Sequence, residues 1–337
     1  MSDPMRSEVE AFARSRFPDA TILPLAGDAS TRRFFRLLCA DGSTRVLMDY
    51  GRPFEGETDD QKLSRLFLAA RLPVAPIEAA SPAAGCLLLR DLGDRTLESA
   101  LSDPALPPDP AAVEHLYERA IELAVAIAVR GTGALERSDR ASGPALDEAR
   151  FRFEMDFFLE HYVAGFRGLG SVPGEVRAAL HRLGDAAAAS PRRVLCHRDF
   201  HSRNLMVLAD GSLAMVDIQD ARWGPDTYDL ASLLQDAYVD IDPGLADRMA
   251  ERYRASLPDP PEASAFRARY AVVAAQRMIK ALGTFGYQAS VLGRSRYLEG
   301  VPRTIARLRH LLPLHAETRD VASVLRSSGV LGGSYGS

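Results

Sequence analysis

The chain contains very little lysine. Only Lys62 and Lys280 are lysines among its 337 residues, and arginine supplies the rest of the basic side chains. The formal net charge is −4 at pH 7. Such a balance gives no strongly positive field, so we expect no nucleic-acid partner and no binding to an anionic membrane. The scarcity of lysine beside abundant arginine, alanine and proline is typical of a GC-rich coding bias.

Cysteine is also scarce, and long hydrophobic runs are missing. Cys39, Cys86 and Cys196 are widely separated and each lies in an apolar stretch, which favours free thiols in a reducing compartment over disulfides. The first residues lack an apolar signal core, and the most apolar helical run, 120–129, is too short to span a bilayer. We therefore expect a cytoplasmic protein with no membrane partner and no evident obligate protein partner.

The remaining composition is that of a globular protein, with 47% apolar and 26% charged residues. The length suits two lobes, and no internal repeat or long low-complexity linker is present. Strand-like segments dominate up to about residue 92, and apolar residues recur at helical spacing from about residue 109. The sequence predicts an α+β fold with a small β-rich N-lobe over 1–92, a helical C-lobe over 93–326 and a flexible tail over 327–337.

The most informative segment is 194–234, where His197-x-Asp199-x-x-x-x-Asn204 is followed by Asp217. This spacing is that of kinase-like phosphotransferases. Between Asn204 and Asp217 two apolar runs flank Asp210-Gly211, which predicts a β-hairpin. A two-residue or four-residue loop would place Asn204 directly across from Asp217, whereas a three-residue loop would shift the pairing by one residue.

These residues suggest distinct roles in a phosphotransferase. Asn204 and Asp217 offer the oxygen ligands that Mg²⁺ takes while substrate phosphates complete its shell. Asp199, on the loop that leads into the hairpin, is placed to contact the acceptor hydroxyl, and His197 is expected to hold that loop. Asp229 at the start of a helix is open to two interpretations, a third metal ligand or a residue that fixes the catalytic loop, and the second is favoured.

A second motif lies between two predicted strands near the N-terminus. The turn is made of Gly27, Asp28, Ala29 and Ser30, whose small side chains let backbone N–H groups approach phosphates. The strand over 85–90 then stops at Asp91-Leu92-Gly93, which predicts a hinge between lobes and a contact with the adenine edge. Both segments are expected to bind ATP.

Together these motifs resemble the aminoglycoside phosphotransferase/choline kinase superfamily, a branch of the protein-kinase-like fold. Within it, the chain is most similar to bacterial anomeric kinases of N-acetylmuramate and N-acetylglucosamine that serve peptidoglycan recycling. The resemblance runs from about residue 20 to 315 and depends on GDASTRRFFR (27–36), VLMD (46–49), LRDLG (89–93), CHRDFHSRNLM (196–206), VDIQDARWGPDTYDL (216–230), QRMIKALGTF (276–285) and YLEGVPR (297–303). It implies a bilobal fold, ATP and Mg²⁺ as cofactors, and transfer of the γ-phosphoryl group to the anomeric hydroxyl of the sugar.

One feature departs from the wider superfamily. The third strand usually carries a lysine that pairs with nucleotide phosphates, but Met48-Asp49 stand in this region here. The sugar-kinase branch resembles the chain in this respect. We expect Arg32 or Arg33 to supply the missing charge, because a guanidinium matches the geometry of phosphate.

The acceptor is less well specified by the sequence. The aromatic and acidic segment 151–162 could line a sugar pocket, and Glu154 and Arg277 are candidate substrate contacts. Two alternatives stay open: a kinase of another small hydroxylated acceptor, such as an aminoglycoside, choline, homoserine or another sugar, and a nucleotide-binding pseudokinase. The presence of Asp199, Asn204 and Asp217 argues against the pseudokinase.

Overall fold

The computed structural model describes residues 5–25, 32–103, 109–138, 140, 143–170 and 172–332. The chain divides into two compact units. Unit 1 comprises Met1–Arg95 and Met206–Gln219, and unit 2 comprises Thr96–Leu205 and Asp220–Ser337. The hairpin segment thus returns to the N-terminal unit, although the sequence placed it with the helical C-lobe. The lobe boundaries at residues 92 and 326 stay predictions.

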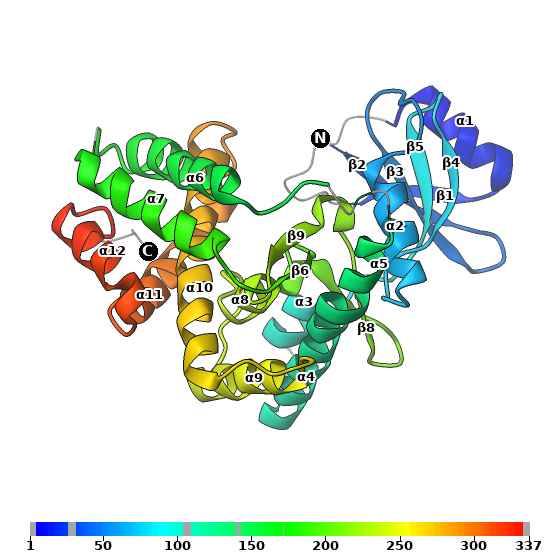
Figure 1. Ribbon diagram of the computed structural model, residues 1–337. Helices are drawn as coiled ribbons and strands as arrows, with labels where there is room; N and C mark the ends of the chain where they lie inside the picture. Colours follow the sequence, from blue (N-terminus) through cyan, green and yellow to red (C-terminus); the bar gives the residue numbers. More distant parts are fainter. Residues whose placement is uncertain are drawn as a thin grey trace. The chain divides into compact units, whose positions relative to one another are not determined.

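Unit 1 is built on an antiparallel five-stranded sheet with the order β1-β2-β3-β5-β4 (Figure 1). Its elements are α1 (Ser7–Arg16), β1 (Thr21–Leu25), β2 (Arg33–Leu38), β3 (Thr44–Asp49), α2 (Asp59–Ala69), β4 (Ile77–Ser81), β5 (Cys86–Arg90), β7 (Leu205–Val207) and β8 (Leu213–Met215). Of these, β7 begins with the last residue before the boundary, Leu205 of unit 2.

Alternation along the strands separates the core of unit 1 from its polar face. In β2, Phe35 and Leu37 are buried, while Arg36 between them points to the other side of the strand. Val9 and Ala13 of α1 share one hydrophobic cluster with these residues, so α1 covers this face of the sheet. Helix α2 begins with a capping box in which Thr58 and Gln61 bind each other's backbone N–H groups.

The hairpin of β7 and β8 closes through a three-residue loop. The Gly211 N–H donates to the Leu208 carbonyl, and the Leu208 N–H donates to the Ser212 carbonyl. Gly211 has a φ of +77°, whereas Asp210 is not among the described residues with positive φ. The loop therefore has three residues, a type I turn followed by a bulge at Gly211. This loop shifts the pairing by one residue, so the expectation that Asn204 pairs directly with Asp217 is wrong.

Unit 2 is mainly helical, with one two-stranded antiparallel sheet of β6 and β9 (Figure 1). Its elements are α3 (Leu97–Ser102), α4 (Pro110–Ala126), η1 (Ile127–Gly131), α5 (Thr132–Glu136), α6 (Glu148–Phe157), η2 (Phe158–Phe166), α7 (Gly174–Ala188), β6 (Arg193–Cys196), η3 (Ser202–Asn204), η4 (Ile218–Asp220), β9 (Arg222–Pro225), α8 (Tyr228–Leu234), α9 (Pro243–Ser256), α10 (Ala263–Ser290), η5 (Ser295–Gly300), α11 (Val301–Leu311) and α12 (Ala316–Ser327). Of these, η4 begins in unit 1 and ends in unit 2.

Helix α10 is the central element of unit 2, because α6, α8, α11 and the π-helix η2 all pack against it. Glycine permits the closest of these contacts. A Cβ atom at Gly286 would lie only 2.5 Å from the carbonyl oxygen of His161 in η2, so no larger residue fits without a backbone shift. This packing fixes the middle of α10, where Arg277 and Lys280 lie.

The fold class predicted from the sequence, a bilobal α+β fold, is confirmed. The structure adds β4 and α12, which the sequence analysis did not identify. The expected phosphate turn over 27–30 and residues 333–337 lie outside the described part of the chain. Within the described part, no helix combines the length and apolar character needed to cross a bilayer.

Candidate active site

The loop after β6 carries Asp199 and is fixed from behind by a buried carboxylate. Asp229, in the first turn of α8, accepts the backbone N–H groups of His197 at 2.6 Å and Arg198 at 3.0 Å. Arg198 has a φ of +82°, a left-handed conformation that costs about 1–3 kcal/mol in a residue with a side chain. Because Asp229 binds the N–H of this strained residue and that of the residue before it, we propose that it supports the loop.

The remainder of the loop has a second buried acceptor. Asp236 accepts the Ser202 N–H at 2.7 Å and the Tyr238 N–H at 2.9 Å. His197 is fully buried, as a residue that supports the loop would be. The loop is therefore held at two points on either side of Asp199, before any ligand is considered.

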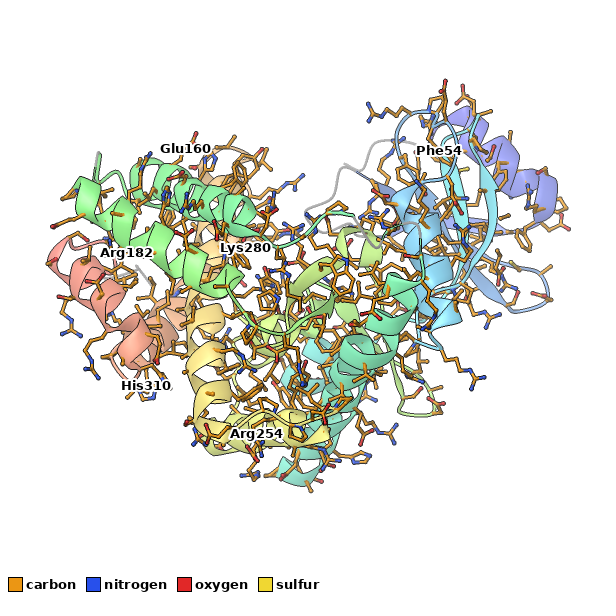
Figure 2. The ribbon with its side chains drawn as sticks, in the orientation of Figure 1. Phe54, Glu160, Arg182, Arg254, Lys280 and His310 are labelled. Atoms are coloured by element: carbon orange, nitrogen blue, oxygen red, sulfur yellow. The ribbon has the colours of Figure 1, made fainter. Side chains whose placement is uncertain are left out.

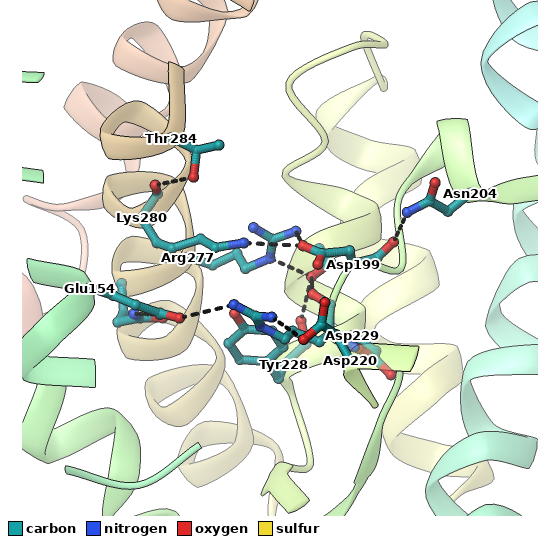
Figure 3. Close-up of polar contacts among 12 residues, drawn as sticks. Glu154, Asp199, Asn204, Asp220, Tyr228, Asp229, Arg277, Lys280 and Thr284 are labelled. Atoms are coloured by element: carbon teal, nitrogen blue, oxygen red, sulfur yellow. Dashed lines mark hydrogen bonds and ion pairs between the residues drawn. The ribbon is translucent and has the colours of Figure 1, made fainter. Parts of the chain in front are cut away.

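Asp199 faces two basic side chains from α10. Its Oδ1 accepts from Lys280 Nζ at 3.1 Å and from Arg277 at 3.3 Å (Figure 3). Among the described residues none donates a hydrogen bond to Oδ2. One oxygen of this carboxylate is thus bound by the protein, and the other is left for a ligand.

The charge of Asp199 follows from this environment. Burial alone would raise its pKa, but the positive charges of Lys280, Arg277 and Arg198 hold the pKa well below the ordinary range. Asp199 is therefore ionised at neutral pH. A carboxylate in this state accepts a hydrogen bond from a hydroxyl group readily but is a weak base.

Asn204 ends the short helix η3 and turns its amide toward the same loop. Its Nδ2 donates to the Asp199 carbonyl at 2.9 Å (Figure 3). The side-chain oxygen consequently points away from that carbonyl, and it accepts no hydrogen bond from a described residue. An oxygen oriented in this way is suited to a hard cation.

Asp217 lies in unit 1, just after β8, and adopts a left-handed φ of +62°. Its Oδ1 accepts from Arg32 at 2.9 Å and from Gln219 at 3.0 Å, while its side chain is 41% exposed. Within the described part of the chain Oδ2 has no hydrogen-bond donor. A carboxylate oxygen with free acceptor capacity is the kind of ligand that Mg²⁺ takes from a protein.

The structure separates the two arginines that the sequence left as alternatives. Arg32 lies between two carboxylates of unit 1 and binds Asp60 at 2.8 Å as well as Asp217. Arg33 instead binds the fully buried Asp49 at 2.6 Å. Arg32 therefore contacts a candidate metal ligand, and Arg33 contacts a buried carboxylate of the sheet.

Asp91 is engaged by unit 1 itself. Its carboxylate accepts from Arg36 at 2.6 and 3.1 Å and from the Gly93 N–H at 2.9 Å. This is the geometry of a structural ion pair at the end of β5, and a nucleotide contact by Asp91 stays a prediction. Gly27, Asp28, Ala29 and Ser30 lie outside the described residues.

Glu154 and Arg277, the two candidate substrate contacts, are both buried and bound within unit 2. Glu154 accepts from Arg150 at 3.0 Å and from Gln276 at 2.9 Å. Arg277 donates to Ser232 at 2.6 Å and lies over the ring of Tyr228 at 5.6 Å. Their protein partners favour roles in positioning the site.

Several site residues were missed by the sequence analysis. Arg198, inside the motif, forms an ion pair with Asp220 at 2.9 Å. Asp60 accepts from the Tyr50 hydroxyl at 2.6 Å in addition to Arg32. Lys280 offered one signal, its rarity as a lysine, but no local pattern linked it to Asp199, which lies 81 residues earlier.

Comparison with known proteins identifies the family of this chain. Residues 21–266, well over half of the chain, match the model of the phosphotransferase enzyme family. The chain belongs to this family. An N-acetylmuramate/N-acetylglucosamine kinase of Pseudomonas aeruginosa is 32% identical, and the match covers 92% of this chain and 89% of that protein. A kinase of the same name from Caulobacter vibrioides is also 32% identical, over 85% of this chain and 86% of that protein.

Solved structures of other phosphotransferases share the fold. An ethanolamine kinase of Plasmodium vivax superposes with a TM-score of 0.62 and 13% identity, covering 92% of this chain and 88% of that one. The aminoglycoside phosphotransferase APH(4)-Ia, in a ternary complex with ADP and hygromycin B, gives a TM-score of 0.54 at 17% identity, with 97% and 100% coverage. The resemblance predicted from the sequence is therefore confirmed, and this family member is a small-molecule kinase.

Proposed function

We propose that this phosphotransferase transfers the γ-phosphoryl group of ATP, with Mg²⁺, to the anomeric hydroxyl of N-acetylmuramate or N-acetylglucosamine. The observation that carries the proposal is the environment of Asp199. Its Oδ1 is bound by two cations of α10, and its Oδ2 is left to accept a hydroxyl proton. The names of the relatives supply the acceptor class.

The acidity of the acceptor matches the weak basicity of Asp199. Neighbouring cations hold the pKa of Asp199 low despite its burial, so this carboxylate is a weak base and is better matched to a more acidic hydroxyl group. The hydroxyl on an anomeric carbon is a hemiacetal and is more acidic than an ordinary alcohol. In phosphoryl transfer the base acts chiefly by orienting its nucleophile, which this carboxylate does well.

The charge around Asp199 also selects among acceptors. Arg198, Arg277 and Lys280 all act on Asp199 as positive charges. A cationic acceptor, such as an aminoglycoside or choline, would meet like charges there, which disfavours it. An N-acetylated sugar is neutral at its nitrogen, and N-acetylmuramate adds a carboxylate, so neither brings a further positive charge to these three side chains.

The phosphate side of the reaction is assigned to three residues. We assign Asn204 and Asp217 as the ligands of Mg²⁺, which when bound neutralises phosphate charge and aligns the phosphoryl group. Arg32, held by Asp60, is assigned the role that the third-strand lysine has in the wider superfamily. ATP binding by the segment 27–30 stays a prediction.

The direct test is a screen of Mg²⁺-dependent ATP consumption with N-acetylmuramate, N-acetylglucosamine, and a set of other sugars, aminoglycosides, choline and homoserine. Phosphorus NMR of the product then locates the phosphate. We expect turnover with the N-acetylated sugars and a signal from an anomeric phosphate. Turnover of a cationic acceptor alone, or phosphate on another hydroxyl, would contradict the proposal, and no turnover with any acceptor would favour the pseudokinase.

A further inference from the structure

Lys280 contacts Asp199 but has no step of the proposed reaction assigned to it. It projects from α10 and its Nζ lies 3.1 Å from Asp199 Oδ1 (Figures 2 and 3). Its side chain is only 14% exposed, so a charged amine is held in a mostly buried position. Any hydroxyl bound to the second oxygen of Asp199 would have this ammonium as an immediate neighbour.

The negative charge of Asp199 does not depend on Lys280 alone. Arg277 binds the same oxygen at 3.3 Å, and Arg198 contributes a further positive charge. Arg277 is itself anchored by Ser232 at 2.6 Å and by the ring of Tyr228. A structural counter-ion is therefore already in place, and a second buried cation on the same oxygen calls for another function.

Lys280 also differs from Arg277 in how firmly it is held. An ammonium has three N–H donors, and within the described chain Lys280 Nζ donates only to Asp199. A lysine is a compact charge on a flexible stem and can turn to a new partner, whereas a guanidinium fixed by two neighbours cannot. Burial lowers the pKa of Lys280, but the Asp199 carboxylate opposes this shift and favours the ammonium form.

We propose that Lys280 is a catalytic residue whose ammonium leaves Asp199 and binds the transferring phosphoryl group in the transition state. The inference rests on the proposed function. As the bond between the acceptor oxygen and the γ-phosphorus forms, the bond from phosphorus to the β-phosphate oxygen breaks, and the hydroxyl proton passes to Asp199. Charge then gathers on the phosphoryl oxygens next to the acceptor, where a donor fixed to the acceptor side of the protein stabilises it.

Two other roles for Lys280 predict different results. If it only kept Asp199 ionised, its loss would move the acid limb of the pH profile and leave the high-pH plateau of kcat unchanged. If it bound the carboxylate of N-acetylmuramate, its loss would raise the KM of that sugar and spare N-acetylglucosamine, which has no carboxylate. A contact with the phosphoryl group lowers kcat for both sugars at every pH.

The experiment compares Lys280→Met with Lys62→Met, which removes the other lysine of the chain from α2. We expect Lys280→Met to lower the plateau kcat by about 10²–10³-fold, the effect of removing one transition-state donor, with KM values little changed. Lys62→Met should retain wild-type kcat. Thermal unfolding checks that each variant folds, and Lys280→Gln replaces the methionine variant if that one does not. A plateau kcat near wild type, or a loss confined to the KM of one sugar, would overturn the inference.

A binding measurement separates this inference from the proposed function. Calorimetric titration with MgADP and fluoroaluminate is run in the presence of the acceptor sugar. Fluoroaluminate mimics the phosphoryl group in the transition state of its transfer. Lys280→Met should weaken this complex by a factor similar to its loss of kcat, while MgADP alone binds as to wild type. Equal weakening of both complexes, or of neither, would reject the role. If wild type phosphorylates neither N-acetylated sugar, the proposed function fails, and Lys280 is tested with whichever acceptor the screen identifies.

Discussion

The carboxylate of Asp229 accepts the backbone N–H of His197 at 2.6 Å, which ties α8 to the start of the catalytic loop. An Asp229→Asn substitution replaces one of the two accepting oxygens with an NH₂ group, which is a donor. One of the two buried backbone N–H groups then loses its acceptor. We expect a loss of about 1–3 kcal/mol in the free energy of unfolding, together with a reduced kcat, because the strained Arg198 loses its support. Urea unfolding and steady-state kinetics measure the two effects.

The control for this variant is Asp242→Asn, which changes the N-cap of α9. Asp242 accepts the Leu245 N–H there, and asparagine caps helices as well as aspartate does. We expect its stability and kcat to stay near wild type. If Asp229→Asn behaved in the same way, the support assigned to Asp229 would be wrong.

Asp199→Asn tests the residue assigned to the acceptor hydroxyl. The amide keeps the size of the side chain but cannot take a proton, so kcat should fall at least about 100-fold, the lower end of general-base contributions. ATP affinity should be largely retained, because Asp199 is assigned to the acceptor. Rapid-mixing kinetics and nucleotide titration measure the two quantities. Wild-type kcat in the variant would exclude the role of Asp199 in catalysis.

Arg32→Ala and Arg33→Ala are a matched pair of variants that test which arginine replaces the missing third-strand lysine. Arg32 binds the candidate metal ligand Asp217, so its removal should raise the KM for ATP by about 10-fold to 100-fold, the loss of a charged hydrogen bond to phosphate. Arg33 is engaged by the buried Asp49, so its removal should cost stability and leave the KM for ATP nearly unchanged. If the KM for ATP were unchanged in both variants, neither arginine would replace the third-strand lysine. If the KM rose in Arg33→Ala and not in Arg32→Ala, Arg33 would be the residue that contacts the phosphates.

The buried carboxylate of Asp49 predicts a pH-dependent contribution to stability. Burial alone would raise its pKa, but hydrogen bonds from Arg6, the Gly51 N–H and Arg33 hold it below the ordinary value. A depressed pKa stabilises the fold above the unfolded value of about 3.9, and this contribution is lost as pH falls through the folded pKa. Asp49→Asn should therefore be less stable than wild type at pH 7, by up to about 3–5 kcal/mol, the cost of removing one partner of a buried ion pair. The difference in unfolding free energy between wild type and this variant should narrow below about pH 4 in urea titrations. A difference independent of pH would contradict a stabilising role of the ionised carboxylate.

The sequence was sufficient to predict the bilobal fold and to nominate the loop, because the spacing of His197, Asp199 and Asn204 is local. It was not sufficient for the hairpin register. Asp-Gly is compatible with a two-residue turn, in which both residues have positive φ, and with a three-residue loop, in which only the glycine does. The Asp210 carboxylate accepts the Ser212 N–H at 2.9 Å, an interaction within the longer loop that composition alone does not reveal.

Contacts between distant segments were also beyond the sequence. The position of Lys280 opposite Asp199 depends on how α10 packs in unit 2, and that depends on glycines such as Gly286 that admit η2 closely. Strand β4 was missed because Glu78 and the two alanines after it have low strand propensity. Pairing with β5 forms the strand in spite of that preference.

The near absence of lysine makes this enzyme unusually easy to observe. Protein grown with nitrogen-15 lysine carries two labelled side-chain amines, and one of them lies against Asp199. Its NMR signal reports directly on the charge and partner of that amine, while Lys62 on α2 serves as an internal reference in the same spectrum. Addition of nucleotide and sugar in turn can then be followed at a single atom, without a mutation or a probe that would alter the site.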